Sequence, residues 1–254
     1  MSMFDLTGKV AIITGSSKGI GKSIAREMAV QGANVVISSR KAPACEEVAA
    51  EINKLGRGKA VSIPANISDK AQLEKLVAET RKQLGPVDIL VCNAASNPYY
   101  GPTEDMPDEA FDKIMRNNIL SNIWLTKMVL PDMRAKKDGV IIIISSIGGL
   151  RGTPIIGAYG ISKAADMALT RNLALELGGD NIRINTIAPG LIKTDFAKAL
   201  WEDEKNLAKR LERQPLKRLG EPDDIGGIAV MLASKAGKFM TGQVIVADGG
   251  VLVA

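Results

Sequence analysis

Short apolar runs alternate along the chain with segments whose apolar residues recur at helical spacing. The runs, which predict buried strands, cover residues 10–14, 35–38, 60–63, 87–92, 140–145, 182–187 and 244–246. The helical patterns lie between them, at residues 23–30, 44–55, 71–84, 110–133, 159–177 and 224–233. Strands that alternate with helices and are apolar at nearly every position predict a parallel sheet covered on both faces. We therefore expect a doubly wound α/β fold with a seven-stranded parallel sheet.

The alternation continues without a break in composition, so residues 1–254 are expected to form a single domain. Two stretches are less regular than the rest, namely residues 95–107 and 190–221. In doubly wound sheets, ligands bind outside the carboxyl ends of the strands. These two stretches are therefore our candidates for substrate-contacting loops.

Charge and cysteine content narrow the range of partners. The net charge is only +5, and basic and acidic residues are interspersed, so we expect no nucleic-acid or membrane partner. No apolar run approaches the roughly 18 residues expected of a membrane span. Cys45 and Cys92 are the only cysteines, which offers no disulfide framework and predicts a reducing, cytoplasmic compartment.

The sequence contains no histidine. This excludes every mechanism that needs an imidazole base, including Ser-His-Asp hydrolysis, and it removes the commonest zinc ligand. Acid-base chemistry must therefore come from Tyr, Lys, Asp or Glu. We expect no metal site.

A glycine-rich turn follows the first predicted strand and opens the first helix. Glycines in this position let the backbone turn sharply and lie close to a pyrophosphate at the helix N-terminus. The turn therefore predicts a Rossmann-type dinucleotide site, with a ligand-free turn as the alternative on these residues alone. The expected cofactor contacts here are Gly15, Ser17, Lys18, Gly19, Ile20 and Gly21.

The spacing T-G-x-x-x-G-x-G, from Thr14 to Gly21, resembles that of the short-chain dehydrogenase/reductase family, and the resemblance extends over nearly the whole chain. An NAD site usually places a carboxylate after the second strand, whereas the 2′-phosphate of NADP needs a cation there. Arg40 follows the second strand, and Lys18 adds a second positive charge. The two match the basic pair of NADP-preferring members. We expect NADP(H) to be preferred, with NAD(H) as the alternative.

Two asparagines complete the expected cofactor site. Asn66 stands where family members commonly have an Asp that hydrogen-bonds the adenine, and an amide keeps that ability. Asn93, in the segment C-N-A-A, resembles the family's N-N-A-G motif with two substitutions. The resemblance implies that Asn93 supports the cofactor ribose and the central strand. A purely structural role is the alternative.

A tyrosine and a lysine are the candidate residues for proton transfer. Tyr159 and Lys163 are four residues apart in a predicted helix and so share one face. An ammonium beside a phenol lowers the phenol pKa from about 10 toward neutral pH, and the oxidised nicotinamide would add a second positive charge. Ser146 ends a predicted strand thirteen residues before Tyr159, which is the family's spacing between catalytic serine and tyrosine. Ser145 is expected to point to the opposite face of the sheet.

The resemblance implies a role for each of these three residues. Tyr159 donates a proton to the carbonyl oxygen as a hydride arrives from the nicotinamide. Ser146 stabilises that oxygen through its hydroxyl. Lys163 lowers the pKa of the tyrosine and binds the nicotinamide ribose.

Three further residues take roles from the same resemblance. Asn118 aligns with a helix asparagine that holds a water in a proton relay leading to the lysine, with the adjacent Asn117 as a less well-spaced alternative. Ile192 and Thr194, in the segment P-G-L-I-K-T, would contact the nicotinamide carboxamide and fix which face of the ring is offered.

Together these features predict an oxidoreductase that transfers a hydride between NADP(H) and a small-molecule carbonyl or alcohol substrate. The candidate pocket residues are mostly apolar and favour a hydrophobic ketone or aldehyde. They are Tyr99, Leu150, Pro154, Ile155, Phe196 and Trp201. Residues 38–41, 97–101 and 188–194 are similar to those of the carbonyl/retinal reductase branch of the family.

Other functions share this scaffold. A 3-oxoacyl-carrier-protein reductase would need a basic patch at the pocket mouth, for which Arg151, Lys193 and Lys198 are candidates. An NAD-dependent alcohol, sugar or steroid dehydrogenase is a further alternative. A non-catalytic NADP-sensing protein is a third, and the intact Asn-Ser-Tyr-Lys set argues against it. The resemblance also implies a homotetramer.

Overall fold

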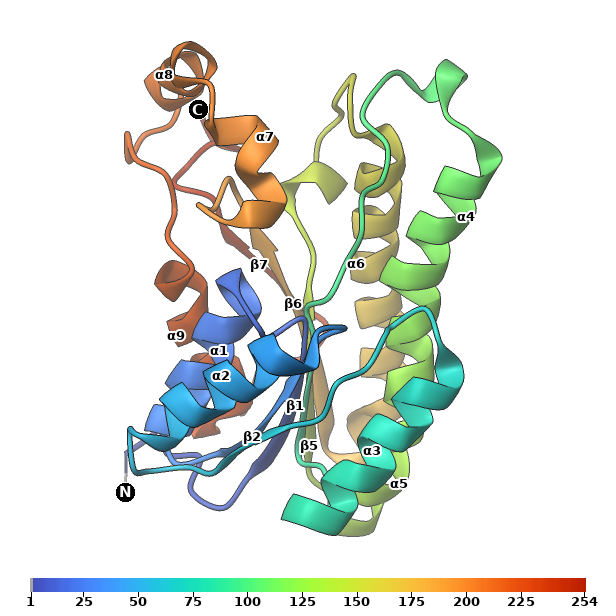
Figure 1. Cartoon of the computed structure of the whole chain (residues 1–254), viewed down its shortest axis with the longest axis vertical. Helices are drawn as coiled ribbons and strands as arrows, with labels where there is room; N and C mark the ends of the chain where they lie inside the picture. Colours follow the sequence, from blue (N-terminus) through green and yellow to red (C-terminus); the bar gives the residue numbers. More distant parts are fainter. Residues whose placement is uncertain (1) are drawn as a thin grey trace.

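A sheet of seven parallel strands in the order β3-β2-β1-β4-β5-β6-β7 forms the centre of the computed structural model (Figure 1). The model describes residues 2–254, apart from the side chain of Asn206. The strands are β1 (Val10–Thr14), β2 (Asn34–Ser38), β3 (Ala60–Ser62), β4 (Ile89–Cys92), β5 (Gly139–Ile144), β6 (Ile182–Pro189) and β7 (Val244–Ala247). Every pairing is parallel, which confirms the predicted sheet. The order reverses between β1 and β4, and such switch points are where doubly wound sheets bind dinucleotides.

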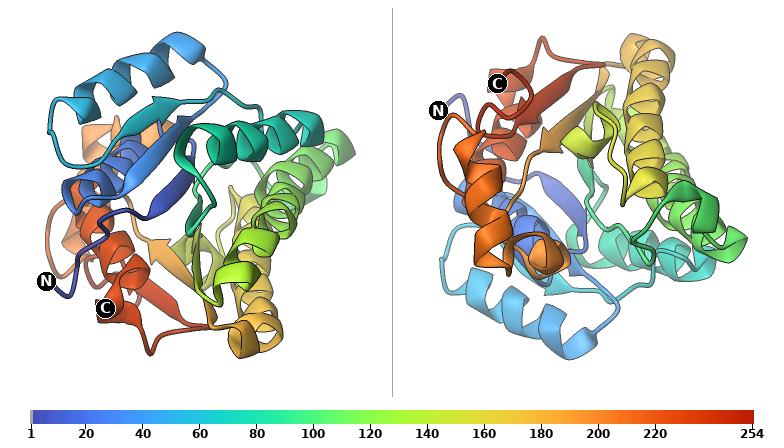
Figure 2. Two further views of the ribbon diagram at one scale, coloured as in Figure 1. Left: turned by 90° about the horizontal axis from the view of Figure 1, so that it is seen from below. Right: turned by 90° about the horizontal axis from the view of Figure 1, so that it is seen from above.

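Helices cover both faces of this sheet, as Figures 1 and 2 show. One face carries α1 (Gly19–Val30), α2 (Ala42–Asn53) and α9 (Asp223–Ala233), and the other carries α3 (Lys70–Leu84), α5 (Ser121–Lys136) and α6 (Gly157–Leu177). Within the described residues, no helix is long and apolar enough to cross a membrane.

The sheet separates two hydrophobic cores. In β1, Ala11 and Ile13 pack toward α1 and α9, while Ile12 between them packs toward α3 and α5. Successive side chains of a strand point to opposite faces, so a strand with helices on both sides must be apolar at every position. This explains why the sequence shows continuous apolar runs in place of alternation.

Residues 110–133, for which the pattern predicts one or two helical stretches, form an interrupted helix in the structure. It consists of α4 (Asp108–Met115), a π-helical turn over Arg116–Leu120, and α5, which contains Pro131. A π-turn inserts an extra residue into the helix and often marks a functional position. Here it holds Asn117 and Asn118 on the buried side.

The predicted loop 190–221 also contains helices. A short 3₁₀ turn over Asp195–Ala197 leads into α7 (Lys198–Trp201), and α8 (Glu204–Glu212) follows. These helices lie beyond the carboxyl ends of the strands (Figure 1). They are short and mostly exposed, so the sequence shows no apolar stripe of the kind that predicts a core helix. The expectation of an irregular loop was therefore wrong for 195–212.

Candidate active site

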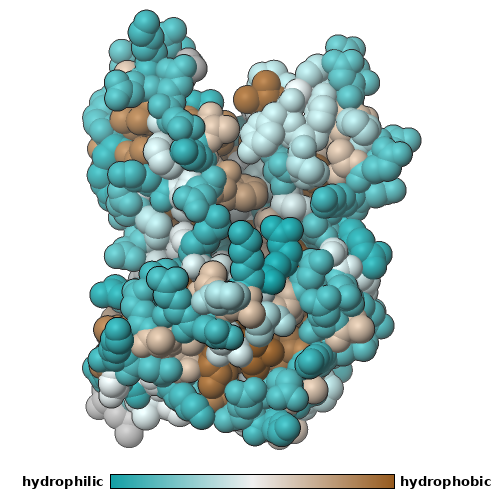
Figure 3. Space-filling model, viewed as in Figure 1, coloured by the Kyte–Doolittle hydropathy of each residue, from teal (hydrophilic) through white to brown (hydrophobic). Residues whose placement is uncertain are grey.

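A cavity of about 920 Å³ opens at the carboxyl ends of the strands. Figure 3 shows the surface hollowed between the lobe of α7 and α8 and the lobe of α4. Most of the predicted site residues line this cavity: Gly15, Ser17, Lys18, Gly19, Ile20, Arg40, Asn66, Asn93, Ser146, Tyr159, Lys163, Ile192 and Thr194. The two that do not are Gly21, which lies beneath the glycine turn, and Asn118, which is fully buried.

The geometry of the glycine turn requires its glycines. Gly15 and Gly19 have φ values of +67° and +56°, a region that side chains other than glycine rarely adopt. A Cβ on Gly21 would lie 2.5 Å from both the Asn93 amide nitrogen and the Gly15 carbonyl oxygen. Gly21 therefore serves the close packing of α1 on the turn, and its contact with the cofactor stays a prediction.

Asn93 holds the turn in place. Its side-chain nitrogen donates to the carbonyl oxygens of Thr14 at 2.9 Å and Gly15 at 3.2 Å, which ties the end of β4 to the glycine turn. No side chain caps the N-terminus of α1, whose extended N-cap residue is Lys18. The first N–H groups of a helix lack intrahelical partners and suit a bound phosphate. The residues present therefore fit a dinucleotide.

Three polar groups mark the end of the cavity at β2 and β3. The Arg40 side chain is exposed, and no salt bridge engages it within residues 2–254. Lys18 differs, because its ammonium lies 2.8 Å from the Asp195 carboxylate across the cavity mouth. Asn66 lines the cavity, and its side-chain oxygen accepts hydrogen bonds from the backbone and hydroxyl of Ser68.

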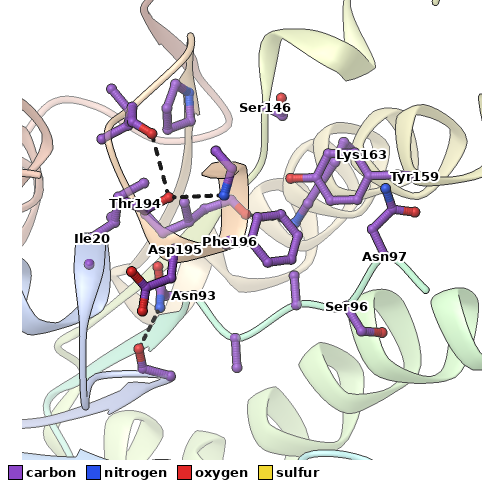
Figure 4. Close-up of a pocket in the computed structure, with 18 of the residues that line it drawn as sticks. Ile20, Asn93, Ser96, Asn97, Ser146, Tyr159, Lys163, Thr194, Asp195 and Phe196 are labelled. Carbon is purple, nitrogen blue, oxygen red and sulfur yellow. Dashed lines mark hydrogen bonds between the residues drawn. The ribbon is translucent and has the colours of Figure 1, made fainter. Parts of the chain in front are cut away.

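The opposite end of the cavity brings together Ser146, Tyr159 and Lys163 (Figure 4). The Lys163 nitrogen lies 5.6 Å from the centre of the Tyr159 ring, which confirms that the two share one face of α6. Phe196 also packs against the tyrosine, with ring centres 5.9 Å apart. Ser145 is buried at the cavity wall, and its hydroxyl donates to the Lys163 carbonyl oxygen on α6.

Close backbone packing fixes the serine relative to the tyrosine. A Cβ on Gly149 would lie 2.6 Å from the Lys163 carbonyl carbon, and one on Gly160 would lie 2.7 Å from the Gly148 oxygen. The turn after β5 therefore rests directly on the first turns of α6. The Ser146 hydroxyl accepts a hydrogen bond from the Gly148 backbone at 3.0 Å, which orients it within this turn.

The environment of Tyr159 acts on its pKa in both directions. Burial raises its pKa, the Lys163 ammonium and the Ser146 hydroxyl lower it, and the nearby Asp166 carboxylate raises it again. The net result for the chain without cofactor is a pKa above the ordinary value. The predicted lowering, which also counted the positive charge of the oxidised nicotinamide, stays a prediction.

Lys163 is buried with a partner that the sequence analysis did not identify. Its ammonium donates to the Ile144 carbonyl oxygen at 2.8 Å and to the Asp166 carboxylate at 3.0 Å. Burial alone lowers the pKa of Lys163, but Asp166 and Tyr159 together raise it above its usual value. The available signal was a carboxylate three residues after the lysine on the buried face of a helix.

Asn118 lies in the π-turn, and its side chain is satisfied within the protein. The amide oxygen accepts from the Ser96 backbone at 2.9 Å, while the amide nitrogen donates to the Ser96 carbonyl oxygen and to the Ser162 hydroxyl. Asn118 thus joins the segment after β4 to α6. Its expected role in holding a water remains a prediction. The neighbouring Asn117 lines the cavity.

The substrate end of the cavity is apolar but differs in detail from the prediction. Of the six candidates, Ile155 and Phe196 line it. The other four lie outside the lining: Tyr99, Leu150, Pro154 and Trp201. Residues one or two positions away replace them, namely Tyr100, Ile156 and Leu200. Hydrogen bonds from side chains to the backbone explain two of these differences. The Tyr99 hydroxyl donates to the Pro102 carbonyl oxygen, and the Trp201 indole donates to the Thr194 carbonyl oxygen.

Basic residues at the cavity are also not those expected. Arg151 lines it, whereas Lys193 and Lys198 do not. Lys198 instead pairs with Glu202 at 3.1 Å, one turn further along. Three cations that were not predicted as part of a basic patch, Lys41, Lys113 and Arg210, also take part in the lining.

Comparison with known proteins agrees with this geometry. A family model described as "Enoyl-(Acyl carrier protein) reductase" matches residues 15–252. Proteins named dehydrogenase/reductase SDR family member 4 are similar over most of their length. The one from Bos taurus is 41% identical over 97% of this chain and 88% of its own, and the one from Caenorhabditis elegans is 38% identical over 96% and 95%. The chain belongs to the short-chain dehydrogenase/reductase family.

Solved structures of other short-chain dehydrogenases/reductases superpose closely. A 7α-hydroxysteroid dehydrogenase complexed with NADH and 7-oxo glycochenodeoxycholic acid has a TM-score of 0.93 and 39% identity, covering 97% of this chain and 95% of that one. A putative NAD(P)-dependent gluconate 5-dehydrogenase from Beutenbergia cavernae, with bound NADP, has a TM-score of 0.94 and 33% identity, covering both chains fully.

This short-chain dehydrogenase/reductase is therefore an oxidoreductase that interconverts carbonyl and alcohol groups with a nicotinamide cofactor. The cofactor, when bound, supplies or accepts the hydride. The Tyr159 and Ser146 side chains both line the cavity, and their roles in exchanging the proton and hydrogen-bonding the substrate oxygen remain predictions.

Proposed function

We propose that the protein is an NADPH-dependent carbonyl reductase acting on a hydrophobic ketone or aldehyde. The observation on which the proposal rests is a group of apolar side chains, Ile155, Ile156, Phe196 and Leu200, which line the cavity together with Tyr159 and a few polar residues. An apolar pocket with a few convergent polar groups suits an apolar ligand with one reacting carbonyl. A tyrosine whose pKa is raised keeps its proton in neutral solution, which is the state that donates a proton in reduction.

The preference for NADPH rests on Arg40. Its exposed guanidinium follows β2 at the cavity, in the position where a 2′-phosphate needs a cation. Related structures hold either NADH or NADP, so the choice belongs to this chain's own residues.

A second candidate function is reduction of an acidic thioester substrate, as in 3-oxoacyl-carrier-protein reductases. It is favoured by the cations that line the cavity, Lys113, Arg151 and Arg210, since a phosphopantetheine arm or an acidic carrier would pair with them. The likeness to dehydrogenase/reductase SDR family member 4 favours the carbonyl reductase.

We propose a homotetramer in a reducing, cytoplasmic compartment. Large apolar side chains are exposed on α6 and near the C-terminus, where Ile161, Leu175, Phe239 and Val253 are open to solvent, and such surfaces are typical of subunit interfaces. Cys45 and Cys92 are both buried and free, which supports the compartment. Light scattering coupled to size exclusion tests the assembly, and a monomer would refute it.

The deciding experiment follows NADPH oxidation with a panel of hydrophobic ketones and aldehydes, quinones, sugars and an acetoacetyl thioester. We expect turnover with the hydrophobic carbonyls.

Tyr159→Phe is the matched control, because it keeps the ring and removes only the hydroxyl. We expect it to bind NADPH normally and to lose turnover by a factor of about 100 or more, as for removal of a general acid. Unchanged kcat in this variant would rule out the mechanism, and thioester-specific turnover would favour the second candidate.

A further inference from the structure

A carboxylate lies buried directly behind the catalytic lysine. Asp166 is three residues after Lys163 on α6 and has no exposed surface. One carboxylate oxygen accepts from the Lys163 ammonium at 3.0 Å. The other accepts from the side-chain nitrogen of Asn122 on α5 at 3.0 Å. Buried carboxylates are rare unless paired, and this one has a partner on each oxygen.

The same network holds the asparagine of the π-turn. The Asn122 side-chain nitrogen that faces Asp166 also donates to the Asn118 carbonyl oxygen at 2.6 Å. A chain of contacts therefore runs from Asn118 through Asn122 and Asp166 to Lys163. Its members come from the π-turn, α5 and α6, so the position of the ammonium depends on three elements.

The network fixes where Lys163 directs its donors. An ammonium has three N–H donors. The Ile144 carbonyl oxygen takes one and Asp166 takes another, which leaves one for the cavity that Lys163 lines. The pair also carries no net charge when both members are ionised. The phenol of Tyr159 therefore faces a neutral ion pair in place of an isolated cation.

We propose that Asp166 is a positioning residue of the Tyr159–Lys163 pair: it holds the lysine ammonium in place and cancels its charge beside the phenol. This inference rests on the proposed carbonyl reductase function. It assigns Asp166 to the reacting groups through Lys163, without contact to substrate or cofactor.

Other titratable groups near the phenol do not obscure this effect. On α6 the tyrosine faces Lys163 and Asp166, and Tyr100 faces it from the segment after β4. Cys92, at the end of β4, faces Lys163 and Asp166, and burial raises the pKa of its thiol. Asn122 on α5 carries no charge. The chain has no histidine, so no imidazole titrates near neutral pH.

The test replaces the carboxylate with two neutral side chains of similar size, Asp166→Asn and Asp166→Thr. Removing a buried anion makes the first proton loss from the coupled Tyr159–Lys163 pair easier, whichever group loses it. We expect the pH at which kcat/KM for carbonyl reduction declines to fall by about one unit in both variants, the lower end of the usual effect of a neighbouring charge. The pH at which kcat/KM for alcohol oxidation rises should fall by the same amount. Asp166→Glu, which restores the charge, is expected to return both limbs toward the wild-type positions.

Asp88→Asn provides the matched control. Asp88 is also buried and pairs with a lysine, Lys136 at 2.6 Å, but it lies at the amino end of β4, away from the cavity. We expect this variant to be less stable than the wild type. The pH dependence of kcat/KM should be unchanged for both carbonyl reduction and alcohol oxidation. If the Asp166 variants bind NADPH and keep the wild-type limbs, the proposal is wrong. Unfolding of both neutral variants, with Asp166→Glu folded, would make Asp166 structural and overturn the proposal as well.

A second readout separates this inference from the proposed function. The chain has three tyrosines, so the ionisation of Tyr159 in the cofactor-free protein is measurable as tyrosinate absorbance against Tyr159→Phe. We expect Tyr159 to ionise at lower pH in Asp166→Asn than in the wild type. Should the wild type reduce no carbonyl, the proposed function fails, and this titration still decides the role of Asp166. An unshifted titration would refute it.

Discussion

Replacing Arg40 with alanine isolates the interaction that we expect to select NADPH over NADH. The guanidinium is exposed and uncommitted to any carboxylate in the described chain, so no existing contact has to break before it pairs with a 2′-phosphate. A hydrogen bond to a charged group contributes about 1.5–3 kcal/mol. Arg40→Ala should therefore lower kcat/KM for NADPH roughly 10- to 150-fold, since every 1.4 kcal/mol corresponds to about tenfold. The value for NADH should stay nearly constant.

Lys18 should contribute less, because it is already engaged. Its ammonium pairs with Asp195 at 2.8 Å, with 67% and 71% of the two side chains exposed. Breaking an exposed pair costs up to about 1 kcal/mol, which reduces the net contribution of Lys18 to phosphate binding. We expect Lys18→Ala to lower kcat/KM for NADPH less than Arg40→Ala does. Asp195→Asn frees the lysine and should raise it by up to about fivefold.

Steady-state kinetics with both cofactors at fixed carbonyl substrate give the ratios directly. Raising the ionic strength provides an internal control, since a contact between exposed charges weakens with salt. The reasoning fails if the unaltered protein uses NADH as efficiently as NADPH. It also fails if Arg40→Ala lowers kcat/KM equally for both cofactors, which would place the guanidinium on a group that they share.

Two further perturbations test the glycine turn and the surface of the fold. Gly21→Ala places a methyl group 2.5 Å from the Asn93 amide nitrogen, which should disturb the glycine turn. We therefore expect the affinity for NADPH, measured by fluorescence, to fall at least tenfold. Unchanged affinity would contradict the packing role of Gly21. The Arg218 guanidinium lowers the pKa of Asp224 to about 2, from the ordinary 3.8. A lowered pKa stabilises the folded state above the unfolded value, and this stability is lost as the pH falls toward 2. Because both side chains are more than a third exposed, Arg218→Ala should lower the urea midpoint of unfolding only slightly at neutral pH and not at all near pH 2; a decrease that persists near pH 2 would show another cause.

Features that repeat along the chain were predictable from the sequence. The strands were recognisable because most of them are buried on both faces, as β5 with its run of isoleucines shows. The glycine turn and the pair Tyr159 and Lys163 were recognisable because their spacing follows directly from the turn and the helix that carry them. In these cases the local sequence and the final fold impose the same pattern.

Features that depend on contacts across the fold were not predictable. The sign of the Tyr159 pKa shift depends on burial and on Asp166, and neither is visible in a Tyr-x-x-x-Lys motif. The ion pair of Lys18 is formed with Asp195, which is distant in the sequence. The two side chains meet only because the segment after β6 crosses the cavity mouth. Helix α8 was missed because its charged, exposed sequence lacks the apolar stripe of a core helix.

The division of the core by the sheet has a consequence for how this enzyme can change. Side chains from β1, β4 and β5 build both hydrophobic layers, so the strands and the helices on them carry most of the stability. Residues 95–107 and 195–212 contribute no residue to either layer, yet both supply residues that line the cavity. Selection for a new substrate can therefore act on these two segments with little effect on folding. Exchanging them for the corresponding segments of a relative should transfer substrate preference while the melting temperature stays nearly constant.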